Sequence, residues 1–286
     1  MKLKVAGGQL GPYAGTRMKQ EQAIRALSQG LVADHKPDLL ILPELISGPY
    51  FALEKNPAWL DTAESIPGPT SQLLAELATE SQCHVTGSFF HRAEDGRYLN
   101  TALLARPDGS FDTPYSKTHI PNIHHGTTRG LEAFYFSGGD GFVVWDVKGV
   151  QVGILICYDR SFPEAWREVR LAGADVIIVL ASSSGFRSAM FVQELQVRAM
   201  ENGVWVVAVN KGGNETCIDA ENPADFYGSS CVIGPDGEVR LALDRQPDVG
   251  FGAEIDVAEA LQARERLDYY ATRRPDLYRQ IAKPVA

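Results

Sequence analysis

Short aliphatic runs and longer amphipathic segments alternate along the chain. Residues 38–43, 150–156, 175–180 and 204–210 are apolar almost throughout, as is typical of strands covered on both faces. Apolar positions recur at helical spacing in residues 17–35, 70–80, 161–173 and 189–202. Further strands are predicted at residues 3–9, 84–90, 99–105, 142–147, 228–234 and 251–256. The pattern predicts an α/β fold in which a mixed sheet, or two stacked sheets, lies between helices.

The alternation continues without a linker or a low-complexity segment across the 286 residues. A chain of this length can bury a full hydrophobic core without disulfides or structural metals. We therefore expect a single domain over residues 1–286. The tail, residues 265–286, is polar with two aromatic clusters, and we expect it on the surface or against a partner subunit.

Charge and cysteine content narrow the classes of function. The net charge is −9 and no basic cluster is present, which argues against nucleic acid and anionic membranes as partners. No apolar stretch is long enough for a spanning helix, and the first residues resemble a strand rather than a signal peptide. The four cysteines have neither disulfide-framework nor zinc-ligand spacing, so we expect a reducing cytoplasm and no metal.

The segment VGILICYDRSFPEAW (152–166) carries the strongest chemical signal. An aliphatic run stops at Cys157, and Ser161 and Glu164 have the S-x-x-E spacing of a helix capping box. Cys157 is therefore predicted on a tight turn between a strand and a helix, where the helix dipole would favour a thiolate. Nucleophiles often occupy such turns, but free cysteine is also among the most buried residue types. Cys157 is a nucleophile or a core residue on this evidence alone.

A nucleophilic thiol needs a base and a group that stabilises an oxyanion. Three histidines lie near each other (His119, His124 and His125), but no carboxylate or cysteine completes a metal-ligand pattern with them. Glu44 and Lys117 are alternatives to histidine as partners of the thiol, because each follows a predicted strand. A carboxylate directly after a buried strand is costly unless it is paired or functional. Most such residues are nevertheless solvated surface charges.

Glu44 in LPEL, Lys117 in YSKTHIP and Cys157 in GILICYDRSFPE together resemble the Glu-Lys-Cys triad of the nitrilase, or carbon–nitrogen hydrolase, superfamily. GGQLGP, VVAVNKGG and GSSCVIGPDGEV extend the resemblance over nearly the whole chain. The resemblance implies a four-layer αββα sandwich with two mixed sheets, assembled as a homodimer or a larger homo-oligomer. It also implies a cysteine-dependent hydrolase without cofactor, in which Glu44 is the base and Lys117 and the Tyr158 amide bind the oxyanion.

The resemblance also implies roles for three further residues, Glu132, Tyr50 and His119. RGLEAFYF resembles the segment with a second active-site glutamate, which would be Glu132. SGPYF, with Tyr50, resembles a loop of β-ureidopropionases and N-carbamoylputrescine amidases, so Tyr50 is a candidate for substrate binding. His119 matches a histidine of the D-carbamoylases, and is a second candidate.

Tyr158-Asp159 after the cysteine resembles the amidase and carbamoylase branches rather than the nitrile-cleaving members, which usually have Trp-Glu there. Arg160 resembles the arginine that holds the substrate carboxylate in N-carbamoyl-amino-acid hydrolases; a guanidinium can bind a carboxylate through two parallel hydrogen bonds. Alternatively, Arg160 pairs with Asp159 or Glu164 and only orders the turn. Ser161 and Gly130 stand where D-carbamoylases have arginine and histidine, so D-specificity is not implied.

The expected reaction is hydrolysis of an N-carbamoyl amino acid, through a thioester, to ammonia, carbon dioxide and the free amino acid. The alternatives are an aliphatic amidase or ω-amidase and an N-carbamoylputrescine amidase. More distant alternatives are a relative without catalysis and a redox-sensing thiol protein.

Overall fold

The computed structural model describes residues 1–126 and 128–283. One six-stranded sheet has the order β16-β1-β2-β3-β4-β5. Strands β1, β2 and β3 run parallel, and the other neighbours in this sheet are antiparallel. Its strands are β1 (Lys2–Gln9), β2 (Leu39–Ile41), β3 (His84–Arg92), β4 (Tyr98–Ala105), β5 (Tyr115–Ser116) and β16 (Val249–Asp256).

A second six-stranded sheet has the order β15-β14-β11-β10-β9-β8. Its central strands β9, β10 and β11 are parallel, and antiparallel strands complete both edges. Its strands are β8 (Val144–Val147), β9 (Val150–Ile156), β10 (Val176–Leu180), β11 (Trp205–Val209), β14 (Cys231–Ile233) and β15 (Val239–Ala242).

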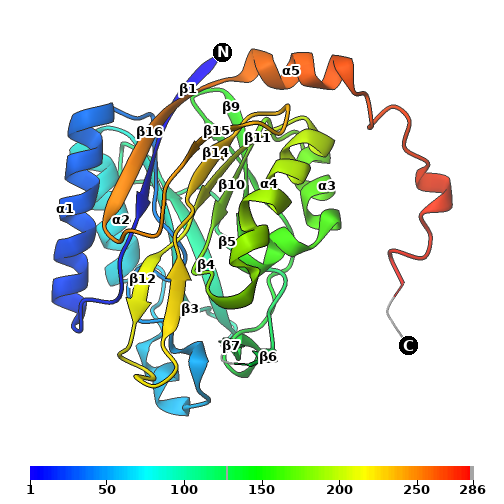
Figure 1. The fold of residues 1–286 in the computed structure, drawn as a ribbon. Helices are drawn as coiled ribbons and strands as arrows, with labels where there is room; N and C mark the ends of the chain where they lie inside the picture. The colour runs from blue at the N-terminus through cyan, green and yellow to red at the C-terminus, as the bar shows by residue number, and fades with distance from the viewer. Residues whose placement is uncertain (127, 284–286) are drawn as a thin grey trace.

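Two helices cover the outer face of each sheet, so the layers are helix, sheet, sheet, helix (Figure 1). Helices α1 (Arg17–His35) and α2 (Pro69–Ser81) pack on the first sheet, and α3 (Pro163–Leu171) and α4 (Ser188–Asn202) pack on the second. The central core lies between the sheets, where residues such as Val5 and Ile41 meet Ile154 and Val207. This arrangement confirms the predicted αββα architecture and explains the fully apolar strands, which are buried on both faces.

The periodic segments were predicted closely, whereas elements without a hydrophobic pattern were missed. Residues 17–35 form α1 and residues 150–156 form β9, as expected. Two hairpins were not predicted: β6 (Ile123–His125) with β7 (Thr128–Gly130), and β12 (Gly212–Glu215) with β13 (Ala224–Tyr227). Their short, mostly polar strands carry little alternation, so the pattern gave no signal. The short 3-10 helices at Phe51–Leu53, Pro57–Thr62, Glu132–Phe134, Cys157–Ser161, Gly185–Arg187 and Pro275–Leu277 were missed for the same reason.

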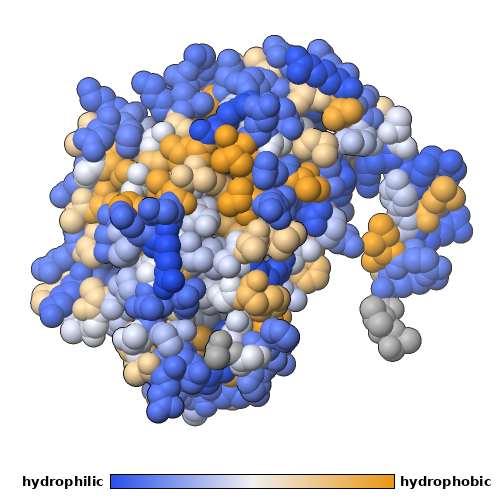
Figure 2. Space-filling view, in the orientation of Figure 1, coloured by the Kyte–Doolittle hydropathy of each residue, from blue (hydrophilic) through white to orange (hydrophobic). Residues whose placement is uncertain are grey.

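The last described part of the chain leaves the body as an arm. Helix α5 (Val257–Arg266), also not predicted, begins at the side-chain cap of Asp256 and runs along the edge of the sheets (Figure 1). Residues 267–283 continue outward and expose apolar side chains, among them Leu277 and Ile281 (Figure 2). Within the described residues, none of the helices combines the length and the apolar character that crossing a membrane requires.

Candidate active site

Cys157 lies at the turn where β9 ends, as the sequence predicted. It begins a short 3-10 helix, Cys157–Ser161, and its φ of 46° is in the left-handed region, which a residue with a side chain rarely adopts. The Arg160 guanidinium donates from Nη1 to the Cys157 carbonyl oxygen at 2.8 Å and so closes the turn. A strained turn of this kind is typical of a nucleophile that must project from the end of a strand.

The predicted capping box is wrong. Helix α3 begins at Pro163, and its N-cap is Phe162, which makes no side-chain cap hydrogen bond. Ser161 lies in the preceding 3-10 turn, where its hydroxyl accepts a hydrogen bond from Arg187 Nη1 at 2.7 Å. The S-x-x-E signal failed because the 3-10 turn inserts residues between the strand and the helix.

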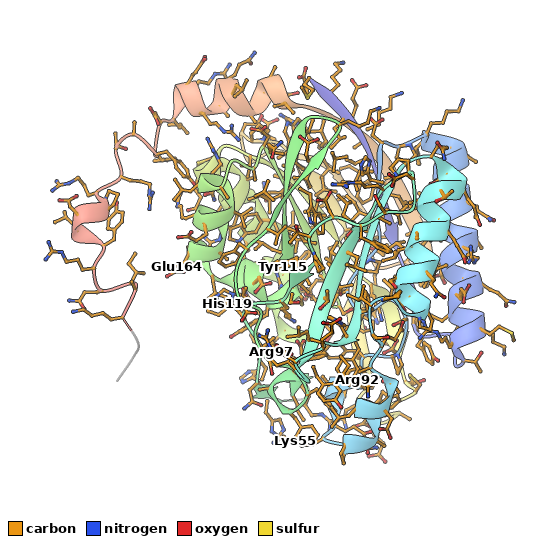
Figure 3. All side chains as sticks on the ribbon, turned by 180° about the vertical axis from the view of Figure 1, so that it is seen from behind. Lys55, Arg92, Arg97, Tyr115, His119 and Glu164 are labelled. Carbon is orange, nitrogen blue, oxygen red and sulfur yellow. The ribbon has the colours of Figure 1, made fainter. Side chains whose placement is uncertain are left out.

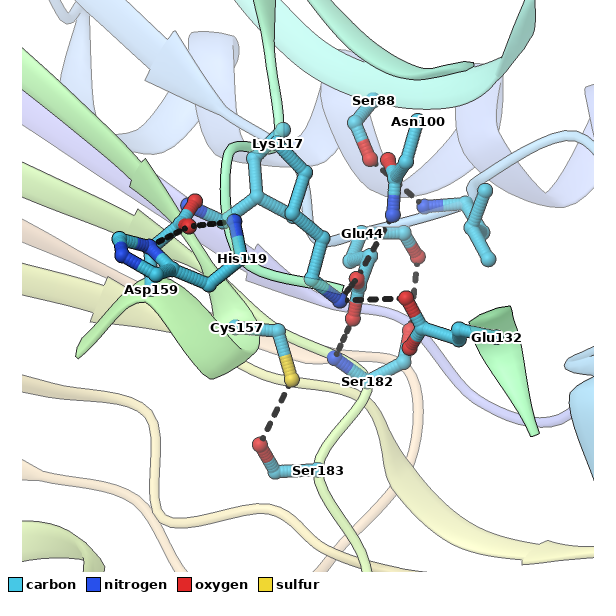
Figure 4. Close-up of polar contacts among 12 residues, drawn as sticks. Glu44, Ser88, Asn100, Lys117, His119, Glu132, Cys157, Asp159, Ser182 and Ser183 are labelled. Carbon is cyan, nitrogen blue, oxygen red and sulfur yellow. Dashed lines mark hydrogen bonds and ion pairs between the residues drawn. The ribbon is translucent and has the colours of Figure 1, made fainter. Parts of the chain in front are cut away.

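Asp159 holds the turn from behind. This buried carboxylate accepts hydrogen bonds from the backbone amides of Ile156 (3.0 Å) and His119 (2.8 Å) and from the Tyr115 hydroxyl (2.7 Å). Burial would favour the neutral acid, but hydrogen bonds from the His119 side chain, the Tyr115 hydroxyl and the His119 amide outweigh it and keep the pKa of Asp159 below its usual range. His119 also places Nδ1 at 2.8 Å from Asp159 and stacks on Phe162, so it lies beside the turn and not in the pocket lining (Figures 3 and 4).

Glu44, Lys117 and Glu132 form a buried charged cluster above the thiol (Figure 4). Lys117 Nζ lies 2.8 Å from Glu44 Oε1 and 2.7 Å from Glu132 Oε2. Glu44 follows β2, Lys117 follows β5, and Glu132 begins a 3-10 helix. The fold therefore brings together the three charged residues that the sequence singled out.

Polar groups that the sequence analysis missed complete the surroundings of Glu44. Asn100 Nδ2 donates to Glu44 Oε1, and the Ser182 amide donates to Oε2, each at 2.8 Å. The Ser182 hydroxyl donates to the Glu44 carbonyl oxygen at 2.8 Å. Ser182 follows the end of β10, where serine is also a common turn residue, and Asn100 lies within β4, so neither residue stood out in the sequence.

The cluster has two carboxylates for one ammonium, and the pKa values reflect this ratio. Burial opposes the charge of Lys117, but Glu132 and Glu44 outweigh it and raise the pKa of Lys117 above its usual range. Burial, partly offset by Lys117 and reinforced by the charge of Glu44, raises the pKa of Glu132 to about 7. Near neutral pH, Glu132 can therefore hold or release a proton while Lys117 stays charged.

The resting thiol is neutral. Its enclosure by protein and the negative charge of Glu44 raise the pKa of Cys157 to about 11, although Lys117 and Arg160 act in the opposite direction. This net shift is opposite to the one expected from the helix dipole, because burial and Glu44 dominate the surroundings of the thiol. Cys157 Sγ lies 3.2 Å from Ser183 Oγ (Figure 4), and the Ser183 amide donates to Asn210 Oδ1 at 2.7 Å. A neutral thiol needs a base to become a nucleophile, which the carboxylates of the cluster can supply.

Tyr50 links this cluster to a carboxylate that the sequence analysis missed. Its hydroxyl donates to Glu132 Oε1 at 2.9 Å, and its backbone amide donates to Glu215 Oε1 at 2.6 Å. Glu215, buried at the end of β12, also accepts from the Tyr13 amide at 2.7 Å. Glu215 is therefore a positioning group for the loop that presents Tyr50 to Glu132.

A pocket opens directly onto the thiol. Its lining contains Cys157, Glu132, Tyr50, Tyr158, Ser183, Tyr227, Arg129, Arg160 and Arg187, with apolar contributions from Pro121, Ile123 and Phe186. The cavity is about 70 Å³, which suits a small polar group such as an amide or a ureido group. Among residues 1–126 and 128–283, no group of three or more histidine, cysteine or acidic side chains is placed to hold a metal ion.

Comparison with known proteins identifies the family of the chain. The carbon–nitrogen hydrolase family matches residues 4–265. The chain is 33% identical over 257 residues to a citrullinase of Francisella tularensis, covering 86% of each chain. It is 32% identical over 261 residues to an N-carbamoylputrescine amidase of Solanum lycopersicum, covering 85% of this chain and 83% of the relative. The crystal structure of a carbon-nitrogen hydrolase from Helicobacter pylori superposes with a TM-score of 0.91 at 26% identity, and the match covers all of both chains. The chain therefore belongs to the carbon–nitrogen hydrolase family and is a hydrolase of non-peptide carbon–nitrogen bonds.

Proposed function

We propose that the protein hydrolyses the terminal ureido group of a small N-carbamoyl compound, with an N-carbamoyl amino acid as the preferred candidate. The observation that carries the proposal is the position of Cys157, a neutral thiol at the base of a pocket beside the buried Glu44–Lys117–Glu132 cluster. The similarity to a citrullinase and to an N-carbamoylputrescine amidase supports a ureido group, because both names denote ureido compounds as substrates.

In the proposed first step, Glu44 takes the proton of the Cys157 thiol, and Sγ attacks the carbonyl carbon of the substrate. The charge that develops on the carbonyl oxygen is stabilised by Lys117 Nζ and by the Tyr158 amide. Glu44 returns the proton to the departing nitrogen, the carbon–nitrogen bond breaks, and ammonia leaves. The product of this step is a thioester on Cys157.

In the second step, a water molecule loses a proton to Glu44 and its oxygen attacks the thioester carbon. Glu132, which contacts the same Lys117, helps to position that water. The carbon–sulfur bond breaks, and the proton on Glu44 returns to the thiolate. A carbamate product then decays to carbon dioxide and the free amine. Every proton moves through groups of this chain.

The second candidate is hydrolysis of a simple carboxamide, as in an ω-amidase or an aliphatic amidase. The proposed steps are the same for a carboxamide, since both substrates present a carbonyl carbon bonded to an NH₂ group. The cavity of about 70 Å³ accommodates either head group. The ureido and carboxamide substrates differ only in the atoms beyond the carbonyl group, so the two functions must be separated by measuring turnover of both kinds of substrate.

A matched panel separates these candidates. Ammonia release would be measured from N-carbamoyl-D-phenylalanine, N-carbamoyl-L-phenylalanine, N-carbamoyl-β-alanine, N-carbamoylputrescine and glutaramate, with an enzyme-free blank. We expect turnover of ureido compounds that carry a carboxylate. Turnover of glutaramate alone would make the protein an amidase and contradict the ureido proposal.

We also propose that the protein assembles with a second copy of itself. The arm after α5 exposes the apolar side chains of Leu267, Leu277, Tyr278 and Ile281, and Figure 2 shows apolar surface on the arm. Helices α3 and α4 expose Leu171, Met190 and Val197 on their outer face. Light scattering on the full chain should give at least twice the mass of one chain, and the mass of a single chain would contradict the proposal.

A further inference from the structure

One wall of the catalytic pocket carries more positive charge than its partners neutralise. Arg160 and Arg187 both line the pocket, and both pair with the same carboxylate, Glu194. The distances are 3.4 Å from Arg160 Nε and 3.0 Å from Arg187 Nη2 to Glu194 Oε2. Among the described residues, no other carboxylate pairs with either guanidinium. Since arginine stays protonated in proteins, this excess charge cannot be relieved by loss of a proton.

The two arginines are not equally available to a ligand. The Arg160 side chain is 4% exposed and already serves the turn: Nη1 donates to the Cys157 carbonyl, and the guanidinium lies over the Phe191 ring. The Arg187 side chain is 30% exposed. Its Nη1 bonds Ser161 and its Nη2 bonds Glu194, and within the described chain Nε donates to no acceptor. A guanidinium has five N–H donors, so Arg187 can bind an additional anion.

The start of α4 adds to the positive potential of this wall. The helix begins at Ser188, immediately after Arg187, with no side-chain cap and no acidic residue in its first turn. The partial positive charge of a helix N-terminus favours an anion nearby. Arg129, another pocket arginine, differs because it pairs one-to-one with Asp219. The excess of positive charge is therefore specific to the wall formed by Arg160, Arg187 and Glu194.

We propose that Arg187 determines specificity by binding a carboxylate of the substrate, while Arg160 positions the turn that carries Cys157. This inference rests on the proposed ureido hydrolysis and refines its substrate class. Arg160 Nη1 lies 3.8 Å from Cys157 Sγ, and Arg187 bonds Ser161, the residue next to Arg160. The carboxylate must therefore lie close to the ureido group, as in N-carbamoyl α- or β-amino acids.

Three ureido compounds of equal length but different charge test this inference. N-carbamoyl-β-alanine is an anion, propylurea is neutral, and 2-aminoethylurea is a cation. The kcat and KM for ammonia release would be measured for the wild type and for Arg187→Gln, Arg187→Lys and Arg129→Gln. In Arg187→Gln, Glu194 still pairs with Arg160, so the wall keeps one balanced ion pair.

For the wild type, we expect the highest kcat/KM with the anion and the lowest with the cation. Arg187→Gln should raise KM for N-carbamoyl-β-alanine by about 10- to 100-fold, the range for a lost charge-assisted hydrogen bond, with a much smaller change in kcat. Arg187→Lys should recover part of that loss. Arg129→Gln is the matched control, and any effect it has should be similar for all three compounds.

Two results would overturn the inference while the proposed function stands: equal wild-type turnover of all three compounds, or an Arg187→Gln loss that is the same for each. If the wild type releases ammonia neither from these three compounds nor from any ureido compound of the panel above, ureido hydrolysis itself fails, and the role of Arg187 fails with it. The wild-type measurements therefore separate the failure of the inference from the failure of the proposed function.

Discussion

Two clusters of charged side chains at the pocket have an excess of charge of opposite sign. At the catalytic end, Glu44 and Glu132 share one cation, Lys117; at the outer wall, Arg160 and Arg187 share one anion, Glu194. The catalytic end can relieve its excess by keeping a proton on Glu132, whose pKa is raised to about 7. The outer wall has no such means, because guanidinium does not release its proton. An imbalance of carboxylates thus creates an acid–base group, whereas an imbalance of arginines creates an anion site.

The largest expected effect is the loss of the shared cation. Lys117→Met should lower kcat by at least about 10²-fold, as expected for removal of an oxyanion donor. It also leaves two buried carboxylates without a counter-ion, so the free energy of unfolding should fall by about 3–5 kcal/mol. Steady-state kinetics and urea unfolding would measure both. An unchanged kcat in a folded variant would remove Lys117 from the oxyanion role.

Loss of the shared anion should have a smaller effect on stability. Glu194→Gln leaves Arg160 and Arg187 without a counter-ion, but the Glu194 side chain is 12% exposed and solvent can reach the site. We expect a loss of about 1–3 kcal/mol in the free energy of unfolding, measured under the same conditions. A loss as large as that of Lys117→Met would show that the two ends do not differ as described.

Glu132→Gln tests the protonation of the catalytic end. The ordinary pKa of a glutamate is about 4.3, so the folded protein retains this proton to higher pH than the unfolded chain. The contribution of Glu132 to stability should therefore be present below about pH 4 and be lost as the pH rises to about 7. Glu132→Gln should remove this dependence between about pH 4 and 7. It should also remove an acid limb of kcat/KM near pH 7, together with part of the activity.

The smallest predicted effect concerns Tyr50. Its hydroxyl donates to Glu132 and so favours the ionised carboxylate. Tyr50→Phe should raise the pKa of Glu132, and the acid limb of kcat/KM should move to higher pH by roughly half a unit to one unit. Tyr135→Phe is a suitable control, since that hydroxyl bonds Glu54 and Asn56 outside the cluster. A pH profile identical to that of the wild type would indicate that Tyr50 only fills space.

The apolar pattern predicted strands and helices with one or two sheets between helices, whereas the resemblance to the carbon–nitrogen hydrolase family implied the four layers and the grouping of Glu44, Lys117 and Cys157. Fully apolar runs indicated strands buried on both faces, and Glu44 and Cys157 follow two of them, β2 and β9, whereas Lys117 follows the two-residue strand β5. Asn100, Ser182 and Glu215 could not be found this way, because their roles depend on contacts with residues far away in the chain. The imbalance around Glu194 was hidden for the same reason, since it joins a turn after β9 to the start of α4.

The essential step of the proposed hydrolysis is attack by a thiol that the carboxylate cluster has deprotonated. It is tested most directly by ammonia release from N-carbamoyl-β-alanine, compared between the wild type and Cys157→Ala at equal concentration of folded protein. We expect turnover by the wild type and none above the blank by Cys157→Ala, with a free energy of unfolding of the variant within about 1 kcal/mol of the wild type. Turnover by Cys157→Ala at the wild-type rate would contradict the account.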